Sequence, residues 1–489
     1  MITKLNFTDR TIKSYAIRKL TPKECFRLMG VRDNVIGTMQ SSNAQTTERL
    51  PDWKGKGKLE DMAISASQQY KQAGNSICID VLAYLYQNLF YPAPPKPRPG
   101  EQLALFDDLE DTLPALPTTA TDKNEEKIFL TTFSGYDSQL MAADVLREWH
   151  PDFRWTCKGW SDIDKYACQM HNLVFPQFAD CALGDITKID WHEVKSSLEG
   201  REVDLFTYSS PCQDISQAGK QMGLQEGSDT RSALLWRVAD AVEVLRPKYL
   251  LQENVAALVS QKFMSDFQKW LDKLSSLGYV SRWARLNAKN YGVPQNRDRV
   301  FCLSMRRDVA FDYYFPEHFE LLTRLEDVLE EEVSDRYFLK DDAVSKFLKA
   351  NDSDNALFLQ FDLPSTHEAA MFLKTLLCDF MEVEGVWQMA IPDAERKIEV
   401  NRKNVVDSWQ NWLTDRDFFS KAFLSESERN MERKNMSNTT RTIVVGMMQT
   451  PPYDRMFDQS RRVYSAKGIS PALHTQRGGD REIKVLVEL

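Results

Sequence analysis

Two polar segments of this chain carry side chains that could perform covalent chemistry, and each follows an apolar run typical of a buried strand. Cys212 lies just after the run 203–208, and Glu253 lies just after the run 249–251. In parallel α/β sheets, reacting groups gather where strands end. A cysteine there can act as a nucleophile, and a glutamate can hold or transfer a proton. The sequence therefore predicts a nucleophile and an acid at two consecutive strand ends.

Two arginines follow in the segment 295–301, which has the composition of a strand. Arg297 and Arg299 alternate, so on a strand they share a face, whereas Asn296 and Asp298 point away. One guanidinium could bond a carbonyl group of a substrate, and the other could brace the loop of Cys212 and lower the pKa of its thiol. The sequence leaves open which arginine does which, and an exposed charged edge strand is the plain alternative.

Three short motifs occur in the order Pro-Cys-Gln at 211–213, Glu-Asn-Val at 253–255 and Gln-x-Arg-x-Arg at 295–299. Together they resemble the signature of the DNA (cytosine-5)-methyltransferases, and the resemblance covers most of the chain. It implies that Cys212 adds to carbon 6 of cytosine, which makes carbon 5 nucleophilic towards a methyl group. It also implies that Glu253 bonds ring N3 and the exocyclic amine. The plain alternatives are a buried structural cysteine and a carboxylate at a helix N-terminus.

The resemblance implies S-adenosylmethionine as the methyl donor. The segment 132–137 resembles the family's Phe-x-Gly-x-Gly loop, except that Asp137 replaces the second glycine. Asp162 is expected to bond the ribose hydroxyls, Ile163 to pack on adenine and Asp185 to accept from the adenine amine, although helix caps and turns could equally use such residues. The full set of expected cofactor contacts is Phe133, Gly135, Asp162, Ile163, Asp185, Pro211, Asn75 and Ser76.

The order of the motifs along the chain is unusual. In the family's ordinary arrangement, segments like 18–30 and 70–76 close the protein, but here they open it. The segment 462–479 resembles what normally precedes them. Circular permutation explains this order, since surface termini joined by a flexible linker are well tolerated. The new ends would then fall between Leu489 and roughly Thr11.

Composition divides the chain into segments of different character. A proline-rich and acidic stretch reads as a flexible linker, and strand and helix patterns alternate after it. We expect a doubly wound, Rossmann-like α/β methyltransferase domain together with a smaller, mixed target-recognition domain. The expected divisions are the permuted segment 1–91, of which 10–60 joins the recognition domain and 64–91 the catalytic domain, the linker 92–126, the catalytic domain 127–310 and the recognition domain 311–489.

The expected macromolecular partner is double-stranded DNA. Carbon 6 cannot be reached in stacked DNA, so the resemblance implies that the base is flipped into the site. The glycine-containing loop 213–231 could close over the DNA, with Gln213, Lys220 and Arg231 as contacts, although it could also be an ordinary surface loop. A net charge of −9 argues mildly against such a partner, but a basic cleft can coexist with an acidic surface elsewhere.

Bulk properties and one short peptide complete the expectations. No apolar run approaches the ~20 residues of a membrane helix, which predicts a cytoplasmic protein without membrane contacts, and we expect a monomer. Eight cysteines show no Cys-x-x-Cys pair, so we expect reduced thiols and no bound metal. The peptide 102–106, Gln-Leu-Ala-Leu-Phe, is similar to the motif by which bacterial proteins dock on the replication sliding clamp.

Two other functions stay open. One branch of the family methylates tRNA, but the long segment 315–458 favours sequence reading of duplex DNA, since the RNA-directed branch has a smaller domain there. The other alternative is a catalytically silent DNA-binding regulator, which the presence of all expected catalytic residues disfavours. The expected setting is restriction-modification or the protection of phage and mobile-element DNA.

Overall fold

The computed structural model describes residues 2–6, 11–41, 64–92, 125–211, 231–340, 357–360, 380–383, 386–389, 444–447, 462–473 and 483–488. The chain divides into two compact units, each with its own sheet. The first unit comprises Met1–Thr21, Arg324–Ile469 and Gly478–Leu489, and the second comprises Pro22–Thr323 and Ser470–Arg477.

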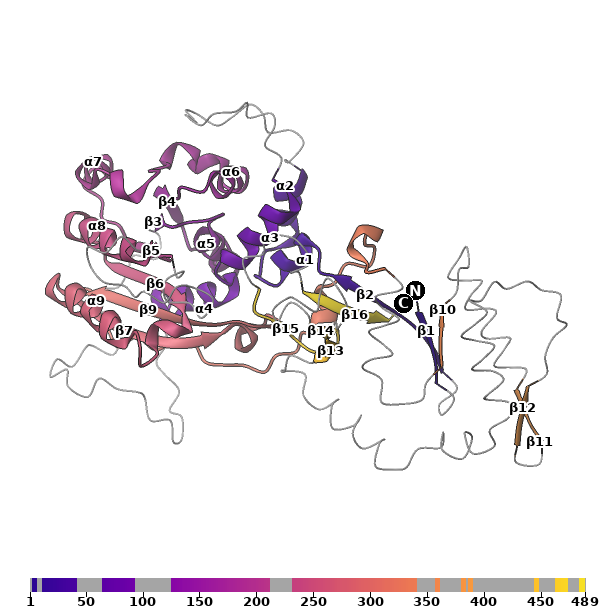
Figure 1. Cartoon of the computed structure of the whole chain (residues 1–489). Coiled ribbons are helices and arrows are strands. Elements are labelled where there is room, and N and C mark those ends of the chain that lie inside the picture. Colours follow the sequence, from indigo (N-terminus) through magenta and orange to yellow (C-terminus); the bar gives the residue numbers. More distant parts are fainter. Residues whose placement is uncertain are drawn as a thin grey trace. The chain divides into compact units, whose positions relative to one another are not determined.

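Six strands form the central sheet of the second unit (Figure 1). They are β3 (Lys127–Thr132), β4 (Trp155–Ser161), β5 (Leu205–Tyr208), β6 (Tyr249–Val255), β7 (Tyr279–Asn287) and β9 (Asp298–Arg306). Their order is β4-β3-β5-β6-β9-β7, in which the first four are parallel and β9 is antiparallel to both of its neighbours. The predicted doubly wound α/β domain is confirmed.

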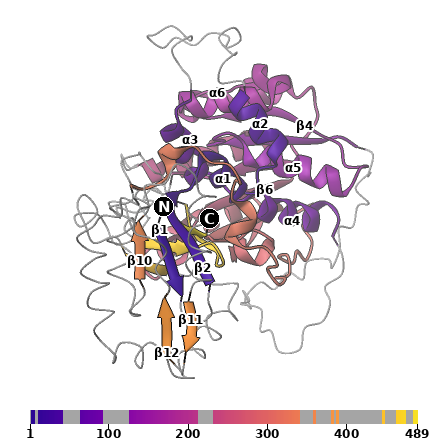
Figure 2. The ribbon, with the colours of Figure 1, turned by 90° about the vertical axis from the view of Figure 1, so that its right-hand side faces the viewer.

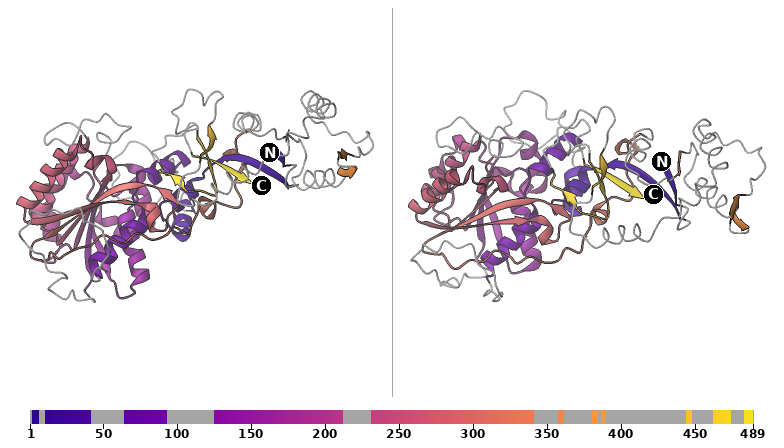
Figure 3. Two further views of the ribbon diagram at one scale, coloured as in Figure 1. Left: turned by 90° about the horizontal axis from the view of Figure 1, so that it is seen from below. Right: turned by 60° about the horizontal axis from the view of Figure 1, so that its bottom comes forward.

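Helices cover both faces of this sheet (Figure 3). They are α4 (Ile79–Phe90), α5 (Ser138–Trp149), α6 (Lys165–Val174), α7 (Trp191–Ser197), α8 (Arg237–Leu245) and α9 (Met264–Ser276). Alternate residues of β3 serve opposite faces because successive strand side chains point in opposite directions. Ile128 and Leu130 belong to the core that includes residues of α7, α8 and α9. Phe129 instead packs against Tyr86 and Phe90 of α4, with ring centroids 5.7 and 6.0 Å apart.

Three further helices of the second unit come from the N-terminal segment, namely α1 (Pro22–Arg27), α2 (Asp33–Ser41) and α3 (Ala66–Asn75). The Ile79 N–H donates to the Met29 carbonyl at 3.0 Å, and the Gln295 side chain donates to the Leu28 carbonyl at 2.6 Å. Phe26 of α1 is fully buried. Our expected boundary near residue 60 is therefore wrong for the described residues from Pro22 onwards, which belong with the catalytic sheet.

The other expected boundary, at residue 311, also differs from the structure. The second unit continues to Thr323 because the segment after β9 packs back onto α4, where the Tyr313 hydroxyl donates to the Leu85 carbonyl at 3.1 Å. Ser470–Arg477 also belongs to this unit, since β15 (Ser470–Pro471) pairs in parallel with β8 (Gln295–Asn296). Helices α4 and α5 lie side by side in the same unit (Figure 2).

The first unit contains a second six-stranded sheet within the described residues. Its order β10-β1-β2-β16-β14-β13 combines β1 (Ile2–Asn6), β2 (Thr11–Lys19), β10 (Leu357–Gln360), β13 (Val444–Met447), β14 (Arg462–Ser465) and β16 (Lys484–Glu488). A separate hairpin joins β11 (Phe380–Val383) and β12 (Val386–Met389). Strand β2, near the start of the chain, pairs antiparallel with β16, near its end, with Ile17 opposite Leu486.

None of the helices in the described ranges is both long and apolar enough to cross a membrane.

Candidate active site

The carboxyl ends of β3, β5 and β6 lie next to one another. Thr132 is the sheet partner of Tyr208, and Tyr208 is the partner of Gln252. The chain continues from β3 to β4 on one side and later to β5 on the other, so these ends lie at the switch point where doubly wound sheets bind ligands. The Ser209 hydroxyl donates to the Phe133 carbonyl at 3.3 Å. A direct hydrogen bond therefore joins the start of the expected cofactor loop, at Phe133, to the start of the segment that leads to Cys212, at Ser209.

The proposed nucleophile itself, Cys212, lies outside the described residues, as do Gln213 and Lys220. Pro211 is the last described residue before it. Arg231 begins a short 3₁₀ helix, but its side chain is not described.

The side chain of Asn254, which was not among the expected site residues, holds Ser210, two residues before Cys212. The Asn254 amide donates to the carbonyl and the hydroxyl of Ser210 at 3.3 and 3.4 Å, while its oxygen accepts from the Val255 N–H at 2.8 Å. Asn254 is buried and is the middle residue of the Glu-Asn-Val motif. Its place beside Glu253 was the signal that could have identified it.

Glu253 lies inside β6 rather than at a helix N-terminus, so the plain alternative for this residue is excluded. Its carboxylate is buried, and the Arg299 Nε lies 3.2 Å from its Oε1. Burial raises the pKa of Glu253 above its ordinary value, although the guanidinium groups of Arg299 and Arg297 oppose this shift. The carboxyl group therefore holds a proton to higher pH than an exposed glutamate does.

Arg297 is buried and occupied with backbone carbonyls. Its Nη2 donates to Gly74 at 3.1 Å and to Ser76, and its Nη1 donates to Leu473 at 3.3 Å. Burial is the main cause that lowers the pKa of this guanidinium. Among the described residues, Arg297 thus braces the segment of Asn75, and Arg299 is the arginine that pairs with Glu253. Asn75 is exposed at the end of α3, and Ser76 is half-buried.

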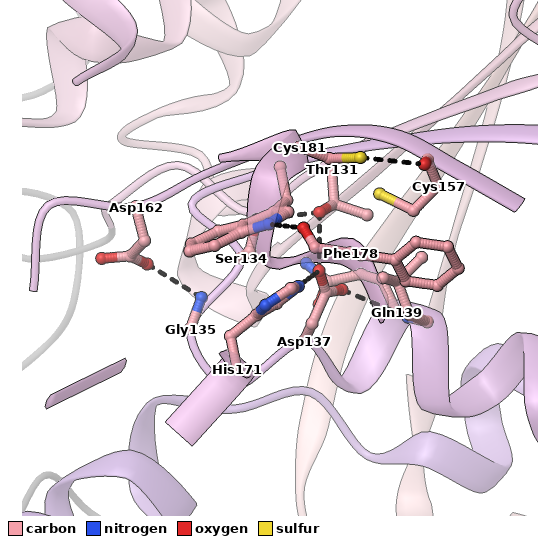
Figure 4. Close-up of polar contacts among 12 residues, drawn as sticks. Thr131, Ser134, Gly135, Asp137, Gln139, Cys157, Asp162, His171, Phe178 and Cys181 are labelled. Carbon is pink, nitrogen blue, oxygen red and sulfur yellow. Dashed lines mark hydrogen bonds and ion pairs between the residues drawn. The ribbon is translucent and has the colours of Figure 1, made fainter. Parts of the chain in front are cut away.

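The carboxylate expected to bond the ribose, that of Asp162, is held by two backbone N–H groups. The Gly135 N–H donates to Oδ2 of Asp162 at 2.8 Å (Figure 4). The Asp164 N–H donates to Oδ1 of the same carboxylate at 2.8 Å. Burial raises the pKa of the Asp162 carboxyl, and these N–H groups oppose the rise. Gly135 has φ +60°, and no atom of the described residues lies within 4 Å of where a Cβ would be, so these residues leave its backbone open to a ligand. Ile163 is 71% exposed, which leaves an apolar surface beside the carboxylate for a flat ring.

Asp185 has the turn role that was its plain alternative. It caps a 3₁₀ helix at Ile186–Lys188 and accepts from the N–H and the hydroxyl of Thr187 at 3.0 and 2.8 Å. These bonds lower its pKa, the backbone bond most, so the carboxylate stays an acceptor. Within the residues that the structure describes, no group of three or more histidine, cysteine, aspartate or glutamate side chains could hold a metal ion.

The fold is a doubly wound α/β domain that carries a buried carboxyl group, that of Glu253, on β6. The sequence profile of the C-5 cytosine-specific DNA methylase family matches residues 147–462. The chain belongs to this family, as its motifs predicted.

Several relatives match portions of the chain. Type II methyltransferase M2.ScrFI of Lactococcus lactis subsp. cremoris is 46% identical over 162 residues, which are 33% of this chain and 43% of that protein. Orphan methyltransferase M.SssI of Spiroplasma monobiae is 47% identical over 108 residues, 21% of this chain and 28% of that protein. Orphan methyltransferase M.Rho11sI of Bacillus phage rho11s is 26% identical over 373 residues, 68% and 64% of the two chains. The chain thus spans less than half of the first two proteins and just under two thirds of the third.

The solved structure of S. pombe Dnmt2 methyltransferase matches with a TM-score of 0.35 and 18% identity over 46% of this chain and 67% of that one. That of a Spodoptera frugiperda DNMT2 mutant matches with a TM-score of 0.34 and 19% identity over 43% and 62%. Neither likeness is close enough to support a functional conclusion.

Proposed function

We propose that this protein is a DNA (cytosine-5)-methyltransferase that transfers a methyl group from S-adenosylmethionine to carbon 5 of cytosine in a short sequence of double-stranded DNA. The observation that carries this proposal is the meeting of three groups at one switch point. These are the Gly135–Asp162 pair, the Ser210–Asn254 contact that leads to Cys212, and the Glu253–Arg299 pair.

Each protein group has a defined task in the reaction. The thiolate of Cys212 adds to carbon 6, and Glu253 donates its proton towards ring N3, so charge that develops on the ring is offset. Bound S-adenosylmethionine supplies the electrophilic methyl group. Arg299 holds Glu253 in place through its Nε at 3.2 Å. Loss of the proton from carbon 5 then expels Cys212 and restores the aromatic base.

The residues proposed for the cofactor divide between two tasks. Asp162 accepts from the ribose hydroxyls and Ile163 supplies the apolar surface under adenine, while Asp185 accepts from the adenine amine. Phe133, Pro211, Asn75 and Ser76 line the remainder of the site. Extrusion of the target base is required because carbon 6 is unreachable in the stack. Gln213, Lys220 and Arg231 are the proposed DNA contacts.

We propose that the chain is a circular permutation of the family's ordinary order. Two contacts support this: Arg297 donates to Gly74 and Ser76, and β2 pairs with β16. The segment 92–126 is the proposed join. A rearranged gene can encode a chain that starts at Glu126, joins Leu489 to Met1 through a short linker and ends after Tyr91. The protein that it encodes should methylate the same sites as the native protein. An insoluble or inactive rearranged protein would count against the permutation.

Bisulfite sequencing of DNA from cells that express the protein tests activity and target together. Methylcytosine at one short sequence is expected, and unmodified DNA in the presence of folded protein would overturn the proposal. Transfer of labelled methyl groups to duplex DNA and to tRNA distinguishes the RNA-directed alternative, and binding without transfer identifies the silent regulator. The relatives named type II and orphan methyltransferases fit a role in restriction-modification or phage DNA protection in the cytoplasm.

The peptide 102–106 lies outside the described residues. We propose that it docks on the bacterial sliding clamp. A titration of this peptide against the purified clamp should give saturable binding that is lost when Leu105 and Phe106 are replaced by alanine. The protein is proposed to be a monomer, which gel filtration would check.

A further inference from the structure

Asp137 occupies the position at which the family's cofactor loop has its second glycine. Its backbone is left-handed, with φ 67° and ψ 59°, although it is the N-cap of α5 and an N-cap residue ordinarily has an extended backbone. This conformation costs free energy for any residue with a side chain, and glycine avoids the cost. The carboxylate must therefore make contacts that glycine cannot make.

The Asp137 carboxylate is fully buried, accepts two hydrogen bonds and lies close to a histidine. Its Oδ1 accepts from the Leu140 N–H at 3.2 Å. Its Oδ2 accepts from the Thr131 hydroxyl at 2.8 Å and lies 3.3 Å from His171 Nε2. A buried carboxylate without such partners would be strongly destabilising. Asp137 and His171 therefore lie as a buried pair, in which the Leu140 N–H and the Thr131 hydroxyl supply the hydrogen bonds to the carboxylate.

The His171 ring is held in place on its other side. It is fully buried on α6 and stacks on Trp160, with centroids 3.8 Å apart and planes at 21°. The Trp160 Nε1–H donates to the Phe178 carbonyl at 2.8 Å. The imidazole is therefore held by packing, and its Nε2 lies 3.3 Å from Oδ2 of Asp137 (Figure 4).

A chain of hydrogen bonds runs from Asp137 to the ends of two strands. Thr131, which donates to Asp137, also bonds the Ser134 hydroxyl at 2.8 Å. The Ser134 N–H donates to the Ser161 carbonyl at 3.0 Å, and the Ser161 hydroxyl donates to the Gly184 carbonyl at 2.6 Å. Each of Gly135, Asp162 and Asp185 is the next residue in sequence after a member of this series of hydrogen bonds, namely after Ser134, Ser161 and Gly184. The proposed function assigns all three to the cofactor.

We propose that Asp137 and His171 are a buried positioning pair that sets the geometry of the cofactor site. This inference rests on the proposed function. The pair touches no expected cofactor atom, and it acts through Thr131 and Ser134 on the loop whose Gly135 N–H bonds Asp162. Preorganising that loop before binding reduces the ordering that binding would otherwise require. This chain thus uses a carboxylate and an imidazole where the family pattern has glycine.

Calorimetric titration of the full chain with S-adenosylmethionine tests the pair. Asp137→Gly removes all three contacts and relieves the left-handed strain, so the variant should fold. Its Kd should rise about tenfold, as expected when a hydrogen bond to a charged group is lost. His171→Leu should raise the Kd similarly, whereas Asp137→Asn retains a cap and a hydrogen-bonding partner and should recover most of the affinity. The matched control is Asp190→Asn, which changes an exposed cap of α7 remote in sequence from the loop and should leave the Kd unchanged.

Steady-state kinetics separate positioning from simple stabilisation. The KM for S-adenosylmethionine should rise with the Kd, while the kcat at saturating donor and the KM for DNA stay within about twofold of the native values. Variants that melt at lower temperature but bind the donor with native Kd would overturn the inference. If Asp137→Gly does not fold, the other two variants test the inference. A raised Kd for His171→Leu together with a nearly native Kd for Asp137→Asn supports it, and a native Kd for His171→Leu overturns it. A native chain that binds no S-adenosylmethionine would instead refute the proposed function.

Discussion

Replacing Arg297 by lysine should destabilise the second unit far more than an ordinary arginine-to-lysine change. The guanidinium is 3% exposed and donates to three backbone carbonyls, those of Gly74, Ser76 and Leu473. Each hydrogen bond from a charged donor contributes about 1.5–3 kcal/mol. A lysine ammonium can satisfy one or two of these acceptors but lacks the planar fork that reaches all three. We therefore expect a loss of about 3 kcal/mol in the free energy of unfolding, since one or two buried carbonyls lose their partner.

Thermal unfolding followed by circular dichroism measures this effect. A loss of about 3 kcal/mol corresponds to a melting temperature lower by about 5 °C for a unit of this size. The matched control is Arg285→Lys, because Arg285 pairs with Asp298 at an exposed position where ion pairs contribute about 0–1 kcal/mol. Equal melting temperatures for the two variants would refute the reasoning, since the buried contacts of Arg297 would then have no energetic consequence.

Burial raises the pKa of Cys78 and of Cys302 to about 12, so both thiols should resist iodoacetamide at pH 8 until denaturant is added. Cys212 should react in the native protein, and mass spectrometry of tryptic peptides distinguishes the three cysteines. Labelling of Cys302 before denaturant is added would contradict its burial in the core. The pKa of Glu253 is raised, so the side chain is fully protonated at a pH below the ordinary glutamate pKa and loses its proton as the pH rises through its raised pKa. The methyl-transfer rate of the native enzyme should therefore fall as the pH rises through the pKa of Glu253. Glu253→Gln should be slower by about 10²-fold, and its rate should not change over the same pH range. If the rate of this variant still fell with rising pH, the pH dependence would belong to another group. Ile163→Ser should raise the KM for S-adenosylmethionine about tenfold without affecting the KM for DNA, because the exposed apolar contact with adenine is lost.

The central sheet could be predicted because its signals are local. The run Lys127–Thr132 is buried throughout, and the motif residues follow such runs directly, so strand ends and reacting groups could be read together. The motifs of Glu253 and Arg299 lie on β6 and β9, which are neighbours in the sheet, so the two side chains come within 3.2 Å of each other.

The remaining features depend on contacts between distant segments of the chain. Arg297 bonds Gly74 and Ser76 more than 220 residues away, and no local pattern shows which carbonyls its guanidinium will meet. The boundary before Pro22 was missed for the same reason, because α1 is assigned by its packing and not by its composition. Asp137 was visible as a departure from the family pattern, but His171, its partner, is a single histidine on a helix with no sequence signal.

Covalent trapping tests the central claim most directly. A duplex that carries 5-fluorocytosine at the target site found by bisulfite sequencing should form a complex with the protein that survives denaturing electrophoresis. The complex should require S-adenosylmethionine and should be lost in Cys212→Ser, because fluorine at carbon 5 prevents the proton loss that releases Cys212. A folded enzyme that methylates the ordinary duplex but is never trapped by the fluorinated one would contradict covalent addition by Cys212.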